Sequence, residues 1–241
     1  YRQRAAADLD QRHPRHWHDL RDPDARHRSF GALDHHAVEY DPARRKLRID
    51  GQTKWGDPSW EDRAVEDAAL PDGETADAVT AALSELREQR FFLAAGFLKP
   101  HLPFVAPSQY FDLYPEGDIE VPKYLYAPVD APSFALHDSG ELRRYRDIPD
   151  SEPISEKKTR ELIRGYHACI SYVDAQVGRL IEAIHENGLS ERTIIVLWSD
   201  HGWHLGEHGT WAKMTLFEWA NRFPWYLRRR NRFHHGILIR W

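Results

Sequence analysis

The chain has 241 residues, of which 41% are hydrophobic and nine are Trp, so it can bury a sizeable core and does not have the composition of a disordered chain. Its 33 basic and 38 acidic residues give a net charge of -5, which excludes the basic footprint of a general nucleic-acid binder. The single cysteine, Cys169, excludes an internal disulfide and a multi-cysteine zinc site, and it leaves the compartment open.

No apolar run in the sequence approaches the roughly 20 residues of a transmembrane helix, so no membrane span is predicted. Residues 1 to 70 are rich in Arg, Asp, His and Pro, and we interpret them as loop-rich structure. The histidines in this segment have no framing strand or helix, so we expect them to be solvated loop residues. They are His13, His16, His18, His35 and His36.

An amphipathic helix is predicted from Thr75, because Val79, Leu83 and Leu86 recur at spacings of three and four. The apolar run at 91–97 then predicts a buried strand. It leads into Lys-Pro-His-Leu-Pro, whose two prolines keep the segment out of a helix and place Lys99 and His101 in a stiff loop.

Residues 105–153 carry many Pro, Tyr and Asp and little periodicity, so we expect a long excursion that covers a site or contacts substrate. Ser155 is the expected N-cap of a helix of about six turns, which Asn187 and Gly188 end. Cys169 falls inside this helix with no neighbouring base, which favours a packing role over a nucleophile.

A second strand is predicted at 193–198, where Thr193 opens the apolar run TIIVLW. Such a run is typical of a strand covered on both faces in a parallel sheet. Asp200 and His201 follow at what should be the carboxyl end of the strand, where open α/β sheets build their ligand sites. We therefore expect an α/β fold in which the strands at 91–97 and 193–198 share one sheet, with His101 and Asp200 at the same rim.

Three long runs follow one another in the chain: FFLAAGFLKPHLPF from Phe91, GYHACISYVDAQVGRLIEAI from Gly165 and SDHGWHLGEHGTWAK from Ser199. In order and spacing they resemble the later part of the sulfatase family, and within it the iduronate-2-sulfatases, over residues 70–224. The resemblance implies an alkaline-phosphatase-like three-layer α/β sandwich, incomplete here because its N-terminal strands are missing. It also implies an extracytoplasmic location.

The resemblance also implies roles for individual residues. Asp200 and His201 match positions that ligate calcium, of which the carboxylate is the more usual partner for this ion. Lys213 matches a lysine that contacts the sulfate and the nucleophile, and His101 matches a histidine that contacts the sulfate and either donates a hydrogen bond or protonates the leaving oxygen. Trp203 matches a position in the sugar-binding pocket.

Nearby polar residues are expected to shape the loops or to contact solvent. Hydrogen bonding that shapes the loop is the expected role of His204 and His208, and Glu207 is weighed between that role and a role in the site. Lys99 is expected to be a solvated neighbour of His101.

The sequence departs from the family at both ends. It contains no Cys/Ser-x-Pro-x-Arg motif, whose first residue becomes the formylglycine nucleophile, and it lacks the paired aspartates that complete the calcium site. We therefore expect residues 1–224 to be a partial catalytic domain, with its core at 75–220, and the isolated chain to be inactive. Residues 225–241 form an atypical basic tail, which is either a shifted reading frame or a basic extension.

Sulfuric ester hydrolysis is the function that the resemblance implies, with calcium and formylglycine as cofactors. The expected partner is a sulfated carbohydrate, such as an iduronate 2-sulfate unit of a glycosaminoglycan, or another sulfate ester. Two alternatives stay open: a phosphoester or phosphonate hydrolase of the same superfamily, and a catalytically inactive remnant that only binds. The Lys-Pro-His loop and the Trp-His-Leu-Gly-Glu-His run favour the sulfatase.

Overall fold

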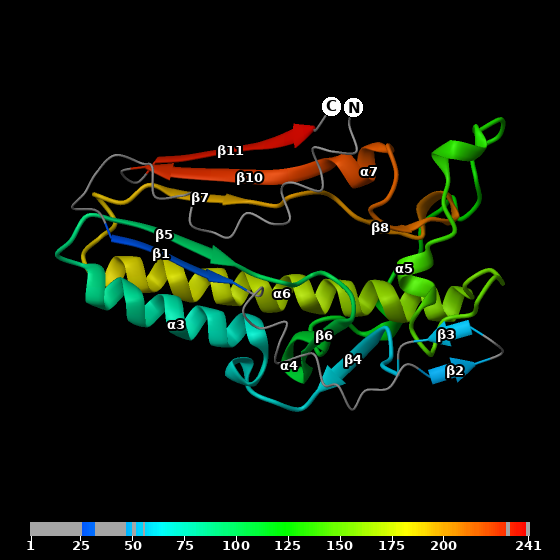
Figure 1. Cartoon of the computed structure of the whole chain (residues 1–241), viewed down its shortest axis with the longest axis horizontal. Coiled ribbons are helices and arrows are strands. Elements are labelled where there is room, and N and C mark those ends of the chain that lie inside the picture. The colour runs from blue at the N-terminus through cyan, green and yellow to red at the C-terminus, as the bar shows by residue number, and fades with distance from the viewer. Residues whose placement is uncertain (1–25, 32–46, 50–51, 55, 230–231, 240–241) are drawn as a thin grey trace.

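The computed structural model describes residues 26–31, 47–49, 52–54, 56–229 and 232–239. The five N-terminal histidines considered above lie outside these ranges. Within them, the two long helices lie side by side beneath a layer of strands, and the part of the 105–153 segment near α5 extends from one end (Figure 1). No helix of the described part is long and apolar enough to cross a membrane.

The two long helices begin and end close to where the sequence predicts. α6 spans Glu156–Glu186, and the side chain of its N-cap, Ser155, accepts a hydrogen bond from the backbone N–H of Lys158. α3 spans Pro71–Leu86. The helix can begin at Pro71 because a proline at the first helical position needs no hydrogen-bond acceptor and already has a helical φ. Both predicted helices are confirmed, with α3 starting four residues before Thr75.

The strand layer differs from the expectation of one parallel sheet. β5 (Phe91–Gly96) pairs in parallel with β1 (Arg26–Gly31). β7 (Ile195–Trp198) instead pairs antiparallel with β10 (Arg222–Arg229), which pairs in turn with β11 (Arg232–Ile239). Among the described strands, β5 and β7 therefore belong to separately hydrogen-bonded sheets. The predicted start of the basic tail at residue 225 falls inside β10.

A shared apolar cluster joins β5 and β7 in place of hydrogen bonds. Val79 and Leu83 of α3 meet Ala183 and Ile184 of α6 in its buried centre, together with Leu189. Phe91 and Leu93 of β5 and Ile195 of β7 pack against it from the strand layer. The remaining β7 side chains are exposed, so the prediction of a strand covered on both faces is wrong for the described structure.

The opposite end of α6 lies on a larger, aromatic-rich core. Here β4 (Trp60–Arg63) pairs in parallel with β6 (Phe104–Pro107), and α4 (Ser108–Phe111) follows directly. We call this cluster the aromatic core; its fully buried side chains include Phe104, Phe111, Leu162 and Tyr172. α6 comes close at Gly165, where a Cβ would lie 3.0 Å from that of Phe104.

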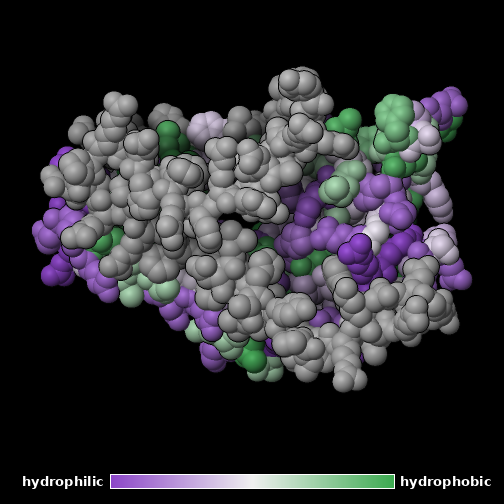
Figure 2. Space-filling model, viewed as in Figure 1, coloured by the Kyte–Doolittle hydropathy of each residue, from purple (hydrophilic) through white to green (hydrophobic). Residues whose placement is uncertain are grey.

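The remaining elements are short. They are β2 (Leu47–Ile49), β3 (Gln52–Lys54), α5 (Gly140–Arg143), β8 (His204–Leu205), β9 (Trp211–Ala212), α7 (Glu218–Asn221) and the single-turn helices Asp67–Ala69, Glu116–Asp118, Ser133–Ala135 and Glu207–Gly209. Hydrophilic side chains gather over the end of the molecule that carries α5 and β8 (Figures 1 and 2). The candidate site lies at this end.

Candidate functional site

Two loops that follow the predicted strands bring His101 and Lys213 together. The Lys213 ammonium nitrogen lies 2.6 Å from Nε2 of His101, although 112 residues separate them in sequence. Nδ1 of His101 lies 2.9 Å from the Leu102 carbonyl oxygen, so Nδ1 carries the hydrogen that is donated to this oxygen. In the neutral imidazole, Nε2 then presents a lone pair to Lys213.

The His101 loop is anchored by a buried carboxylate, that of Asp72 at the start of α3. Its two oxygens accept the backbone N–H groups of Leu98 and Lys99 at 2.7 and 2.9 Å. Lys99 itself is 6% exposed and donates its ammonium to the Pro103 carbonyl, so the expectation of a solvated lysine is wrong. Burial of the stem and the carbonyl contact make Lys99 a brace of the loop.

The Lys213 loop is a tight hairpin of β8 and β9 with a polar brace at its turn. Glu207 accepts the backbone N–H of Leu205 at 2.6 Å, and Gly206 and Ala212 have positive φ values of 105° and 68°. The structure thus supports the loop-shaping role weighed for Glu207 from the sequence. The left-handed conformation at Ala212 directly precedes Lys213 and sets the direction in which the chain leaves β9.

His204 is the first residue of β8, and its side chain is fully buried. Nε2 of its ring shares a hydrogen bond of 2.7 Å with the Thr215 hydroxyl. Burial lowers the pKa of His204 to about 4, and the nearby His137 and His208 act in the same direction. The ring is therefore neutral at pH 7, which supports the structural role predicted for it.

Glu141 is a site residue that the sequence did not indicate. Its carboxylate lies 3.1 Å from Nε2 of His101 and 3.8 Å from the Lys213 ammonium nitrogen. It stands on α5, in the excursion predicted to cover a site or contact substrate, where no periodicity or motif singles it out. When the His101 ring is protonated, the hydrogen bond that its Nε2 donates lowers the pKa of the Glu141 carboxyl, and the charges of His101, Lys213 and His201 act in the same direction, while burial opposes them.

Trp203 forms a wall of the site beneath Lys213 and His101. The Lys213 ammonium lies over its ring at 5.0 Å from the centroid, and His201 stacks on it at 6.1 Å between centroids. Tyr166 of α6 stacks at 6.5 Å, and His101 meets the ring edge-on at 5.4 Å. The indole therefore links the aromatic core to the site, and protein groups already occupy its faces.

Asp200 and His201 follow the end of β7. The Asp200 side chain is 81% exposed, with one oxygen 3.4 Å from Nε2 of His201. Nδ1 of His201 donates to the Gly202 carbonyl at 2.8 Å if the ring has the corresponding tautomer.

These two residues do not make a calcium site by themselves. Calcium takes about six to eight oxygen ligands, and one carboxylate with one imidazole falls well short. Within the described ranges, no group of three or more His, Cys, Asp or Glu side chains is arranged to hold a metal ion. The described residues therefore do not form a calcium site.

A family model of the sulfatases matches residues 29–235. The chain belongs to the sulfatase family. It is 40% identical over 139 residues to a sulfatase of Formosa agariphila and 39% identical over 140 residues to human iduronate 2-sulfatase. These matches cover 57% and 56% of the chain but only 27% and 26% of the two relatives, so the chain spans about a quarter of their length.

The fold of the chain is the alkaline-phosphatase-like fold of sulfatases and phosphonate hydrolases. The structure of a phosphonate monoester hydrolase of Agrobacterium radiobacter matches with a TM-score of 0.61. The match covers 82% of the chain and 41% of that structure at 20% identity. This likeness supports the fold class predicted from the sequence.

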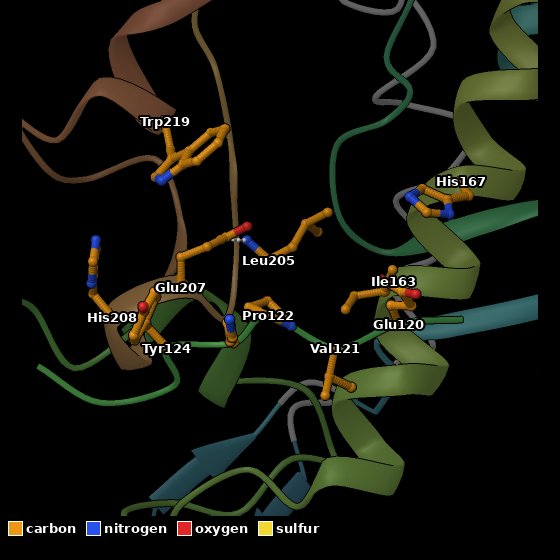
Figure 3. Close-up of a pocket in the computed structure, with 11 residues that line it drawn as sticks. Glu120, Val121, Pro122, Tyr124, Ile163, His167, Leu205, Glu207, His208 and Trp219 are labelled. Atoms are coloured by element: carbon orange, nitrogen blue, oxygen red, sulfur yellow. Dashed lines mark hydrogen bonds between the residues drawn. The ribbon is translucent and has the colours of Figure 1, made fainter. Parts of the chain in front are cut away.

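A pocket of about 400 Å³ opens beside the hairpin of β8 and β9 (Figure 3). The segment at 120–124, α6, the turn after β8 and α7 all contribute to its walls. The aromatic side chains of Tyr124 and Trp219 line it and are exposed, and Lys123 and His167 add polar groups. α6 contributes to both places, because Tyr166 stacks on Trp203 and the next residue, His167, lines the pocket.

Cys169 lies on α6, within the aromatic core. It is fully buried in α6, and its thiol lies 3.5 Å from the Val105 carbonyl oxygen. A packing role for this cysteine is confirmed.

Proposed function

We propose that the chain forms part of a hydrolase that cleaves sulfate esters of sugars. The convergence of Lys213 and His101 beside Trp203 carries this proposal, because it puts an ammonium donor and an imidazole together in a member of the sulfatase family. The iduronate 2-sulfatase relatives favour a sulfated sugar of the glycosaminoglycan type as the substrate.

Lys213 is suited to stabilise negative charge as the sulfur–oxygen bond breaks. Its ammonium is held by His101 on one side and by the Trp203 face on the other, so little reorganisation is needed when an anionic group arrives. Once the His101 ring is protonated, it is suited to donate the Nε2 proton to the leaving oxygen, since Nε2 is the ring nitrogen that faces the site.

Formylglycine would supply the attacking oxygen, and it would have to come from polypeptide that this sequence does not contain. Its precursor motif is absent here, and the single cysteine is buried in α6. Calcium is proposed from the family alone, with Asp200 as one ligand and His201 beside it. The other oxygens would likewise come from outside the described residues.

The pocket beside the hairpin is suited to the sugar ring. Sugar rings pack their C–H faces on exposed aromatic side chains, and Tyr124 and Trp219 supply two such surfaces. Trp203 keeps the role of a wall of the site in this proposal, because Lys213 and His201 lie against its ring.

Binding and turnover measured on the same 241-residue chain test the proposal. Methyl sulfate titrated into the ¹⁵N-labelled chain should perturb the amides around Lys213 and His101, and Lys213→Ala should weaken this binding at least tenfold, the loss expected for a charged donor. Hydrolysis of 4-nitrophenyl sulfate should be undetectable even with calcium, for want of a nucleophile.

Two outcomes contradict the proposal in different ways. Methyl sulfate binding that is insensitive to Lys213→Ala removes the assignment of the sulfate site. Turnover that disappears in Lys213→Ala shows that the chain contains an attacking group of its own, and the formylglycine requirement is then wrong.

A further inference from the structure

We infer that Glu141 is a specificity-determining residue, whose carboxylate makes the site favour a singly charged ester over a doubly charged one. The inference rests on the proposed sulfate site at Lys213 and His101. It concerns a residue to which the family resemblance assigns no role.

The first support is the geometry of the three groups. Nε2 of His101 faces both the Lys213 ammonium at 2.6 Å and the Glu141 carboxylate at 3.1 Å. One ring nitrogen cannot accept from the ammonium and donate to the carboxylate at once. Nε2 therefore bonds to only one of these two groups at a time. An anion that binds Lys213 lies close to the Glu141 carboxylate, because both groups adjoin the same imidazole nitrogen.

The second support is that the Glu141 carboxylate is held in place. The N-cap of α5 is tied to β9, which directly precedes Lys213, because the Ser139 hydroxyl accepts the backbone N–H of Trp211 at 3.0 Å. Leu142 is fully buried, and the Arg143 guanidinium donates to the carbonyls of Asp138 and Pro149 at 2.7 and 2.8 Å. These contacts fix the backbone of α5, from which the Glu141 side chain reaches His101.

The third support is charge. Glu141 is partly buried, with 26% of its side chain exposed, and its contacts favour the ionised form. A negative charge fixed beside Lys213 offsets part of the attraction for any anion. The penalty grows with each negative charge that the ligand brings, and it is larger here than in open solvent because the carboxylate is partly buried.

The number of negative charges on the ligand distinguishes two classes of ester. A sulfate monoester carries one negative charge at neutral pH. A phosphate monoester carries nearly two, because its second pKa is about 6. Glu141 should therefore disfavour the phosphate monoester, which is the class that the open alternative of a phosphoester hydrolase would use.

Methyl sulfate and methyl phosphate, titrated at pH 8 into the ¹⁵N-labelled 241-residue chain, test this inference. We expect Glu141→Gln, which keeps the size and removes the charge, to strengthen methyl phosphate binding on the order of tenfold more than methyl sulfate binding. Glu141→Asp should retain the wild-type preference, because it keeps the charge. Glu152→Gln, an exposed position in the same excursion, serves as the matched control and should change neither affinity.

A pH series adds a readout that a merely structural residue would not move. Methyl phosphate binding to the wild-type chain should strengthen relative to methyl sulfate binding as pH falls from 8 to 5 and the phosphate takes up a proton. In Glu141→Gln this relative gain should shrink.

The failures are distinguishable. If methyl sulfate binding does not depend on Lys213, the sulfate site and the inference fall together. If binding depends on Lys213 but Glu141→Gln changes both affinities equally, the sulfate site stands and Glu141 is a structural brace, which overturns the inference alone.

Discussion

Phe104 on β6 and Trp198 on β7 are both large apolar side chains on strands, yet they differ in burial. Phe104 on β6 is fully buried at the centre of the aromatic core, in edge-on contact with Tyr166 and Trp203. Trp198 on β7 is 64% exposed. The aromatic core thus uses its apolar surface for burial, whereas most of β7 contributes hydrogen-bonded pairing with β10 and little burial.

The difference shows where the site gets its rigidity. Trp203 packs against the aromatic core, and three buried members of that core, Leu102, Leu142 and Trp211, lie within two residues of His101, Glu141 and Lys213. Each of the three loops of the site is therefore fixed by a neighbour in this one cluster. β7 delivers the chain to Asp200 but does not itself pack against the site.

The sharpest test of this comparison is a pair of truncations. Phe104→Ala should lower the free energy of unfolding by about 3–5 kcal/mol, because it removes a fully buried ring and leaves a cavity under Trp203. Trp198→Ala should cost less than about 1 kcal/mol, since most of the side chain already contacts water. Urea unfolding of both variants measures the difference. Equal losses would mean that β7 stabilises the fold as much as the aromatic core does.

The second test uses pH and concerns His204, which lies buried beneath the hairpin. Its pKa is about 4 in the folded chain and ordinarily 6.5, so between these values the unfolded chain binds a proton that the folded chain does not. Stability should therefore be fully present above pH 6.5 and fall as pH decreases toward 4. The His204 share is about 2 kcal/mol between pH 7.5 and 5.

Urea unfolding across this pH range should show a shallower slope in His204→Gln than in the wild-type chain. His137 and His167, whose pKa values are also lowered by burial, contribute in the same direction and remain in both proteins. Thr215→Ser keeps the hydroxyl that contacts His204 and should keep the wild-type slope. An unchanged slope in His204→Gln would show that the ring takes up its proton without unfolding.

The same contrast explains what could be predicted from the sequence. α6 was predictable from Ser155 to Asn187 because its signals are local: an N-cap and apolar spacings of three and four. The burial of β7 was not predictable, because the apolar run at Thr193 is the same whether or not another layer covers the strand. His101 and Lys213 were found through motifs. Glu141 lies in a stretch without periodicity and reaches the site only through tertiary contacts of α5.

The last test compares two exposed tryptophans, Trp219 at the pocket and Trp198 on β7. They are 52% and 64% exposed, so burial alone predicts similar behaviour and small stability losses on truncation. Only Trp219 lines the pocket that we assign to the sugar ring. An aromatic platform that loses its ring loses contact area with a sugar but none with a bare sulfate group.

Trp219→Ala should therefore weaken binding of glucosamine 6-sulfate by about tenfold or less and leave methyl sulfate binding unchanged, a pattern that NMR titration of both ligands can measure. Trp198→Ala is the matched control and should change neither affinity. Tyr124→Ala, on the facing wall, should repeat the Trp219 pattern, whereas Tyr126→Ala, exposed in the same segment but outside the pocket, should not. If Trp198→Ala weakened sugar binding as much as Trp219→Ala, the sugar would contact the strand layer. Recognition would then not be confined to the end of the molecule that rests on the aromatic core.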